Sequence, residues 1–276
     1  MKTALISVAE LQQALVQEPL MILRALMKDP INGTADNHQS DFLPNTFNFD
    51  IDSEGSDPSS SLPHTFPGVD TLALHLGHIG LSIDTPVVVY DNHGIYSAPR
   101  VWWLLKALGH KNVKILDGGL PAWKAAALPI NPGSAVPGHN RFYEPQPEAD
   151  WFVGAGEVEA SLGSATQIVD ARSRDRFSGK VPEPRAGVRR GHIPGSYNVP
   201  FTELLENQRF KKVRALKDAF AQAGVDLSKP IICSCGSGVT ACIVGVAALL
   251  SGATVVSVYD GSWAEWGANT QYPVEV

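Results

Sequence analysis

The segment Pro230-Ile-Ile-Cys-Ser-Cys-Gly-Ser-Gly-Val-Thr-Ala-Cys242 predicts a strand, a tight turn and a helix in succession. Ile231-Ile232 is an apolar run typical of a buried parallel strand, and a second apolar run with helical character extends over residues 243–250. Gly236 and Gly238 mark the turn between them. In α/β proteins, ligands bind at such turns, beyond the carboxyl ends of the strands. The segment therefore predicts an α/β fold with a site at this turn.

Cys235 stands at the mouth of the turn, and we interpret it as a nucleophile. The two glycines allow successive backbone N–H groups to point inward as an anion nest, and the helix N-terminus adds partial positive charge. Such an environment favours the thiolate, which is the nucleophilic form of cysteine. The local pattern is equally typical of a core cysteine, which is our interpretation of Cys233 on the strand and Cys242 on the helix.

The composition indicates a globular protein of one large or two ordinary domains. The chain has 276 residues, of which 44% are hydrophobic and 18% charged. A net charge of −6 argues against nucleic acid or an anionic membrane as partner. No apolar run approaches the roughly 20 residues of a membrane span, and the N-terminus is too soon polar for a signal peptide. Three cysteines within ten residues make no disulfide framework, so we expect a reducing compartment, by default the cytoplasm.

The chain repeats itself, which predicts two tandem α/β domains, each a parallel sheet flanked by helices. The matching segments are 86–94 with 230–238, 116–123 with 259–266 and, more weakly, 42–44 with 192–194. Their offsets are 144, 143 and 150 residues. Proline and glycine are dense around residues 131–148, as in a connection. We therefore expect domains over 1–135 and 151–276, with a linker over 136–150.

The repeat places Asp91 at the position of Cys235. A carboxylate cannot perform thiolate chemistry, and it would itself fill an anion nest. The first domain is therefore expected to be catalytically silent.

Two further stretches, residues 50–68 and residues 172–190, have an unusual composition. Residues 50–68 are rich in Ser and Pro and predict a surface loop, although they also hold a histidine and several acids. Residues 172–190 are rich in arginine. We expect a solvated loop for most of these side chains, namely Arg172, Arg174, Arg189 and Arg190. At least one other arginine is expected to face a carboxylate, which suits the guanidinium fork.

Several motifs together resemble the two-domain rhodanese family of sulfurtransferases. They are the loop Cys235-Gly-Ser-Gly-Val-Thr240, the segment Gly191-His-Ile-Pro-Gly195, the ending Tyr259-Asp-Gly-Ser-Trp263 and the tandem arrangement. The six-residue loop is similar to that of the branch that uses 3-mercaptopyruvate. The branch that uses thiosulfate usually has Arg and then Lys after the cysteine, where this chain has Gly236 and Ser237.

The resemblance implies roles for individual residues. Cys235 would carry sulfur as a persulfide, and Ser237 would form a proton relay with His64 and Asp52. Arg176 and Arg185 would bind the carboxylate and keto oxygen of the substrate. The loop residues Gly236, Gly238, Val239 and Thr240 would surround the transferred sulfur. The implied partners are a small-molecule sulfur donor and a thiol, thioredoxin-like protein or cyanide as acceptor, with no metal or organic cofactor.

The first domain departs from the family pattern in two places. Leu23-Arg24-Ala25 stands where a strand ending in Asp is usual, and Asp41-Phe-Leu-Pro-Asn45 stands where a His-Ile-Pro-Gly segment is usual. These departures concern packing of the silent domain.

Other functions remain open at this point. The nearest alternative is a sulfurtransferase that uses thiosulfate as its donor. Another alternative is a persulfide carrier without enzymatic activity. A cysteine phosphatase would need an arginine closing a Cys-x5-Arg loop, and that position is Ala241.

Overall fold

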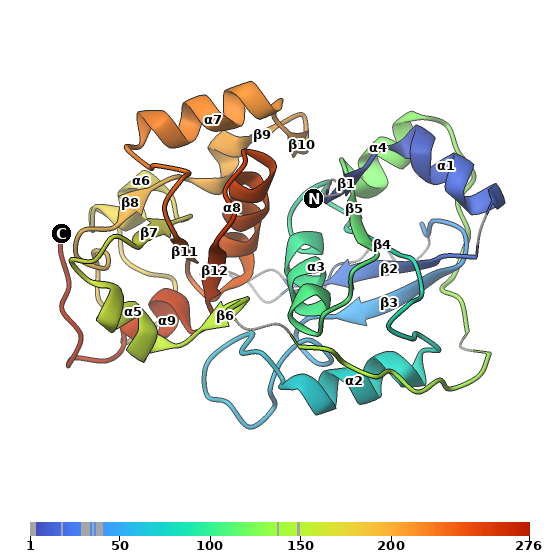
Figure 1. Cartoon of the computed structure of the whole chain (residues 1–276), viewed down its shortest axis with the longest axis horizontal. Coiled ribbons are helices and arrows are strands. Elements are labelled where there is room, and N and C mark those ends of the chain that lie inside the picture. The colour runs from blue at the N-terminus through green and yellow to red at the C-terminus, as the bar shows by residue number, and fades with distance from the viewer. Residues whose placement is uncertain are drawn as a thin grey trace. The chain divides into compact units, whose positions relative to one another are not determined.

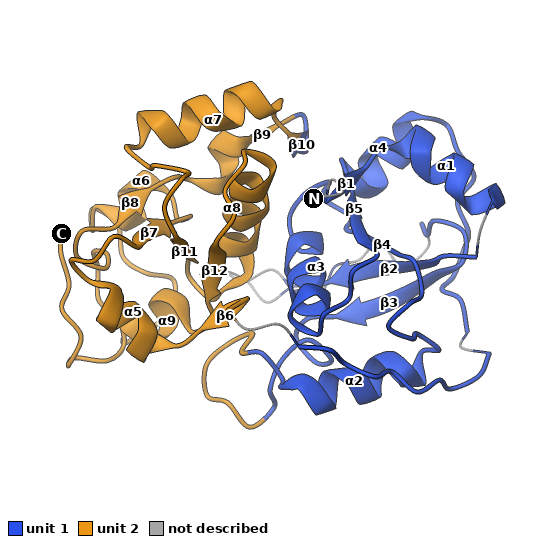
Figure 2. Ribbon diagram, in the orientation of Figure 1, with its two compact units in different colours: residues 1–58, 66–149, 207–209 blue, residues 59–65, 150–206, 210–276 orange. Residues whose placement is uncertain are grey.

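The computed structural model describes residues 4–17, 19–28, 34, 36, 41–136, 138–147 and 150–276. These residues form two compact units (Figures 1 and 2). Unit 1 comprises residues 1–58, 66–149 and 207–209, and unit 2 comprises residues 59–65, 150–206 and 210–276. Of the sequence-based linker, Pro137, Glu148 and Ala149 lie outside the described residues, as do Met1 to Thr3 at the N-terminus. The boundaries at 135 and 151 stay a prediction.

Unit 1 is a five-stranded sheet with strand order β1-β5-β4-β2-β3, in which every neighbouring pair is parallel. Its elements are β1 (Leu5–Ile6), α1 (Val8–Gln17), β2 (Met21–Leu26), β3 (Thr46–Asp50), α2 (Val69–His78), β4 (Val87–Tyr90), α3 (Ala98–Ala107), β5 (Val113–Leu116) and α4 (Gly119–Ala125).

Alternation along the strands divides unit 1 into layers. Val88 and Tyr90 of β4 face a cluster that includes Leu11 of α1 and Trp123 of α4. Val89, between them, is fully buried and points the other way, toward the face where α3 packs on β4 and β5. A strand that is apolar on both faces is expected for a parallel sheet covered by helices on both sides.

Unit 2 has a sheet of the same kind, with strand order β6-β12-β11-β7-β8 and parallel pairing throughout. Its elements are β6 (Phe152–Val153), α5 (Ala155–Ser161), β7 (Gln167–Asp170), α6 (Arg174–Phe177), β8 (Tyr197–Asn198), the 3-10 helix η1 (Phe201–Leu204), β9 (Leu205–Glu206), β10 (Arg209–Phe210), α7 (Val213–Gln222), β11 (Ile231–Ser234), α8 (Val239–Leu250), β12 (Val256–Tyr259) and α9 (Ser262–Trp266). Helices α5 and α9 pack on one face, and α8 packs on β11 and β12.

The two units share one topology, so the predicted fold class is confirmed. Each sheet follows the same strand order, and each weakly matched segment makes the same antiparallel bridge to a later part of its unit. Phe42 pairs with Asn131, and His192 pairs with Glu275. Cys233 and Cys242 are fully buried, as expected of core cysteines, and burial raises the pKa of Cys233.

His110 is a buried, uncharged group in the core of unit 1. Its Nε2 lies 2.9 Å from the carbonyl oxygen of Thr85, which can only accept, so Nε2 carries the proton. Nδ1 therefore accepts the hydroxyl hydrogen of Tyr143 at 3.0 Å. Burial is the main reason that the pKa of His110 is lowered to about 4.

Acidification should weaken unit 1 through this residue. The unfolded chain binds the proton first, near pH 6.5. Stability that is present above that pH is therefore lost as the pH falls toward 4, by roughly 3 kcal/mol in total. Amide hydrogen exchange of unit 1, measured between pH 7 and 4, should show this loss. His110→Asn should reduce the pH slope, whereas the exposed His139→Asn should keep it. An unchanged slope in His110→Asn would contradict the interpretation.

Candidate active site

The loop that follows β11 forms the candidate site. Cys235 is 2% exposed, and Gly238 adopts a left-handed φ of 77° immediately before α8. A side chain at that φ would be strained, so glycine is required there. Helix α8 begins at Val239, and it is long enough, at 12 residues, to present a full N-terminal dipole to the loop. Gly236 and Thr240 are half-buried, so the loop reaches solvent at these two positions.

Helix α9 turns the loop carbonyls away from the site. The N–H of Trp263 donates to the carbonyl oxygen of Cys235 at 3.0 Å, and that of Ala264 donates to the carbonyl oxygen of Gly236 at 2.9 Å. In a trans peptide the C=O and the following N–H point in opposite directions. The N–H groups of Gly236 and Ser237 therefore point away from α9, toward the interior of the loop. This is the arrangement that an anion nest requires.

Ser262 is a structural part of the site that the sequence did not identify. It is fully buried and has a φ of 50°, which is uncommon for a residue other than glycine. Its hydroxyl oxygen accepts the N–H of Cys235 at 3.1 Å and donates to the carbonyl oxygen of Tyr259 at 2.7 Å. The repeated motif over 259–263 was the signal that could have revealed it.

His64 and Ser237 meet within unit 2. His64 Nδ1 lies 3.0 Å from Ser237 Oγ, and the two residues are only 8% and 7% exposed. His64 also has a positive φ of 59°. The loop over 59–65 is thus built to present this imidazole beside the residue two positions after Cys235.

Asp52, the third predicted relay residue, belongs to unit 1. One carboxylate oxygen accepts the backbone N–H of Lys28 at 2.7 Å, and its own N–H donates to Asp50 at 2.9 Å. Its partnership with His64 stays a prediction.

Arg176 lies against Gly236. A Cβ added to Gly236 would be 3.1 Å from Arg176 Nη2. A side chain at position 236 would therefore push this guanidinium away, so the glycine leaves space for a side-chain cation as well as freedom for the turn.

Arg185 is half-buried, and burial lowers its pKa. The charge of Cys235 acts most strongly in the opposite direction, followed by Glu183, while Arg176 adds to the lowering. Arg185 is therefore electrostatically coupled to Cys235, Glu183 and Arg176.

The prediction that Arg172 and Arg189 are solvated is wrong. Arg172 is 2% exposed and binds Asp170 and Glu183, because its guanidinium is enclosed among these carboxylates and the ring of Trp263. Arg189 donates to four backbone carbonyl oxygens of the C-terminal segment. Arg174, by contrast, is exposed, as expected, and pairs with exposed Glu203.

The corresponding loop of unit 1 holds Asp91. Its carboxylate accepts the N–H groups of His93, Tyr96 and Ala98 at 2.9, 2.7 and 3.0 Å, and the residue is fully buried. Leu120 N–H binds the carbonyl oxygen of Asp91 at 2.9 Å, the counterpart of the contact between Trp263 and Cys235. The repeated loop of unit 1 thus encloses a negative group supplied by its own chain.

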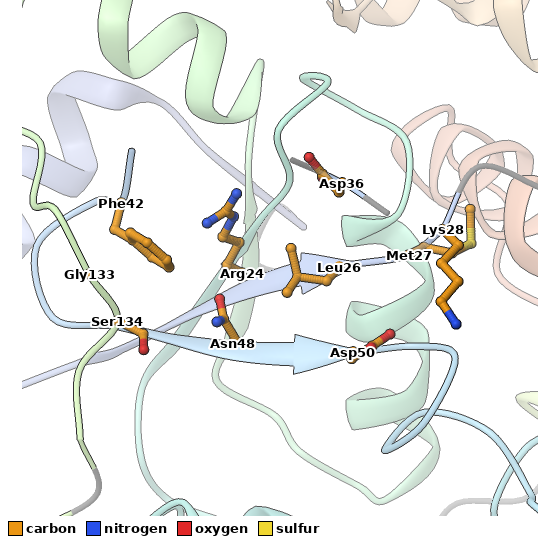
Figure 3. Close-up of a pocket in the computed structure, with 10 residues that line it drawn as sticks. All are labelled: Arg24, Leu26, Met27, Lys28, Asp36, Phe42, Asn48, Asp50, Gly133 and Ser134. Carbon is orange, nitrogen blue, oxygen red and sulfur yellow. The ribbon is translucent and has the colours of Figure 1, made fainter. Parts of the chain in front are cut away.

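Arg24, the fourth residue of β2, stands at the position that the acid Asp170 has in unit 2. It pairs in register with Tyr90, as Asp170 pairs with Ser234 in unit 2. The side chain is buried, stacks 4.5 Å from the Phe42 ring and donates to Asn92 at 3.0 Å. It lines a pocket of about 460 Å³ together with Lys28, Asp36 and Asp50 among others (Figure 3). The lining contains two cationic and two acidic side chains, so their formal charges cancel.

The described residues contain neither a membrane-spanning helix nor a cluster of metal-ligating side chains. In the ranges given above, no helix is long and apolar enough to cross a membrane. The same ranges contain no group of three or more His, Cys, Asp or Glu side chains that could hold a metal ion.

Comparison with known proteins identifies the family. The Rhodanese-like domain matches residues 38–126 and 154–269. The human 3-mercaptopyruvate sulfurtransferase is 42% identical over 81% of this chain and 76% of its own length. The Escherichia coli K12 3-mercaptopyruvate sulfurtransferase is 40% identical over 93% of this chain and 92% of its own. The crystal structure of SseA from Escherichia coli superposes with a TM-score of 0.84 at 34% identity, covering 95% of this chain and 99% of that one. The chain belongs to the rhodanese family, and the resemblance found in the sequence is confirmed.

The unit 1 loop provides a test of how tightly this fold holds a negative group. Asp91→Ala should reduce the free energy of unfolding of unit 1 by about 2 to 4 kcal/mol, because three backbone N–H groups lose a charged acceptor. Asp91→Asn, which keeps one acceptor oxygen, should lose less. The exposed Asp84→Ala is the control and should stay within about 0.5 kcal/mol of the original in urea titrations. Equal stability of the two alanine variants would contradict the assignment.

Proposed function

We propose that the protein takes sulfur from 3-mercaptopyruvate, carries it as a persulfide on Cys235 and passes it to an acceptor. The observation that carries this proposal is the position of Cys235 at the N-terminus of α8, in a loop whose carbonyls are bound by α9. Backbone N–H groups and the helix dipole there stabilise negative charge on sulfur.

The first half-reaction is a nucleophilic attack on sulfur. The Cys235 thiolate attacks the thiol sulfur of 3-mercaptopyruvate, an S–S bond forms, and the C–S bond breaks. The electron pair of that bond leaves with the three-carbon fragment as pyruvate enolate. The proton on the transferred sulfur then moves to the enolate carbon, which yields pyruvate and an anionic persulfide. No external oxidant, reductant or proton is needed.

Ser237 and His64 are suited to move that proton. Their hydrogen bond of 3.0 Å connects the loop to an imidazole, a group that can accept and donate a proton. In the proposal Asp52 completes the relay by orienting His64.

The donor preference follows from Gly236. Mercaptopyruvate carries its charge on a carboxylate several bonds from its sulfur, so its cations belong outside the loop. The closeness of Arg176 to Gly236 and the electrostatic interaction of Arg185 with Cys235 support giving them this role. A larger side chain at position 236 would crowd the Arg176 guanidinium. The remaining loop residues Gly238, Val239 and Thr240 would surround the outer sulfur. In the second half-reaction, a thiol, a thioredoxin-like protein or cyanide attacks that sulfur and releases the Cys235 thiolate.

The proposal extends to the setting of the enzyme. A working thiol favours a reducing compartment, and we place the protein in the cytoplasm. We assign catalysis to the domain over 151–276 together with His64 and Asp52, and a silent role to the rest of residues 1–135.

Mass spectrometry after exposure to 3-mercaptopyruvate without acceptor tests the proposal. Cys235 should gain the mass of one sulfur atom, with one pyruvate released per persulfide. Cys233→Ala and Cys242→Ala, which change the two core cysteines, should keep the added sulfur. Turnover with an unmodified Cys235, or sulfur on another cysteine, would refute the proposal.

The relay predicts a slower first half-reaction in His64→Asn. Asparagine tolerates the left-handed φ of this position but cannot shuttle a proton at neutral pH. Single-turnover pyruvate release should slow by about a hundred-fold, and Ser237→Ala should add little further loss in the double variant. Exposed His78→Asn on α2 serves as the control. Slowing of the acceptor step alone would show that the relay is misassigned.

A further inference from the structure

Glu183 is a buried carboxylate shared by two arginines. Its side chain is 4% exposed, and Oε1 accepts Arg172 Nη1 at 2.9 Å and Arg176 Nε at 3.2 Å. Its other oxygen, Oε2, accepts Arg176 Nη2.

The contact with Glu183 determines which part of Arg176 remains available. A guanidinium has two edges that can hold a carboxylate with two parallel hydrogen bonds. Glu183 occupies the edge formed by Nε and Nη2. The edge formed by Nη1 and Nη2 lies near Gly236, at 3.8 and 3.1 Å from the position of an added Cβ. That edge is left to receive a second carboxylate beside the loop.

Glu183 is itself anchored to the framework of the nucleophile. Arg172 binds Asp170 through Nε and Nη2, donates to the carbonyl oxygen of Gly191 at 2.8 Å and lies 4.4 Å from the ring of Trp263. Asp170 pairs in register with Ser234, the residue before Cys235. Trp263 holds the carbonyl oxygen of Cys235. A continuous set of contacts therefore runs from β11, the strand that precedes Cys235, through Arg172 and Glu183 to Arg176.

We propose that Glu183 is a positioning residue that holds the Arg176 guanidinium over Gly236, with its outer edge turned toward the carboxylate of the substrate. The inference rests on the proposed function, in which Arg176 binds that carboxylate. Glu183 acts through Arg176 and does not touch the substrate. Its negative charge slightly reduces the attraction of the site for anions, and the loss of orientation in its absence outweighs that gain.

Glu183→Gln tests the proposal, with Glu203→Gln as a matched control. Arg174 is on helix α6, as Arg176 is, and it donates to Glu203 through its own Nε and Nη2, at 2.9 and 2.7 Å. Unlike the pair of Arg176 and Glu183, this pair is exposed. Glu183→Gln should raise the KM for 3-mercaptopyruvate about ten-fold with kcat changed less than about three-fold, since a contact made alike in ground and transition state is weakened. Glu203→Gln should change neither. An unchanged or lowered KM in Glu183→Gln would overturn the proposal.

A double-variant cycle separates positioning from general structural damage. In an Arg176→Ala background, Glu183→Gln should raise KM no further, because its effect passes through Arg176. Effects that multiply would overturn the proposal. If Arg176→Ala alone leaves KM unchanged, the role of Arg176 in the proposed function fails. If Arg176→Ala raises KM and Glu183→Gln does not, only the role of Glu183 fails.

Glu183→Asp keeps the test informative if the glutamine variant does not fold. Aspartate preserves the charge between the two arginines but is shorter by one methylene. It should give a KM between those of the original protein and Arg176→Ala. A KM equal to that of the original protein would argue against positioning.

Discussion

The geometry of the candidate site depends on two backbone hydrogen bonds from α9 to the loop after β11. Trp263 and Ala264 bind the carbonyl oxygens of Cys235 and Gly236 and so direct the intervening N–H groups to the opposite side. Without these contacts the turn could flip its peptides, and carbonyl oxygens would repel an anionic sulfur. Ser262 supports the same arrangement by binding the N–H of Cys235. Main-chain groups therefore contribute to the electrostatic character of the site.

The two units show one loop put to two uses. In unit 1 the loop encloses the carboxylate of Asp91, which is a permanent anion held by three N–H groups. In unit 2 the equivalent position is Cys235, which the proposed function makes the nucleophile. The same contact from the following helix is present in both, from Leu120 and from Trp263. The repeated fold thus offers the same loop in both units, and in the proposed function the side chain at this one position determines whether the loop holds a fixed carboxylate or a reactive sulfur.

Local pattern was enough to predict the parallel sheets and the glycine turn, because strand, turn and helix follow one another directly in the sequence. For Cys235 the same pattern was equally typical of a nucleophile and of a core cysteine. It failed for Arg172 and Arg189, because a high density of arginines is typical of a solvated loop. The sequence pattern does not show that acids and backbone carbonyls enclose these two side chains in the folded protein. Ser262 was missed because it acts on Cys235, which is 27 residues away in the sequence. Glu183 was missed although Arg176 is only 7 residues away, because the sequence pattern does not show which of the nearby arginines an acid binds. The meeting of His64 with Ser237 spans 173 residues. Only the resemblance to a family predicted it, and the same resemblance is the sole basis for Asp52.

The most direct test of this account is a crystal structure of the protein after reaction with 3-mercaptopyruvate in the absence of an acceptor. We expect an outer sulfur on Cys235 within hydrogen-bonding distance of the backbone N–H groups between Gly236 and Thr240. An outer sulfur held mainly by side chains, or directed away from these amides, would contradict the claim that the main chain stabilises the reactive anion.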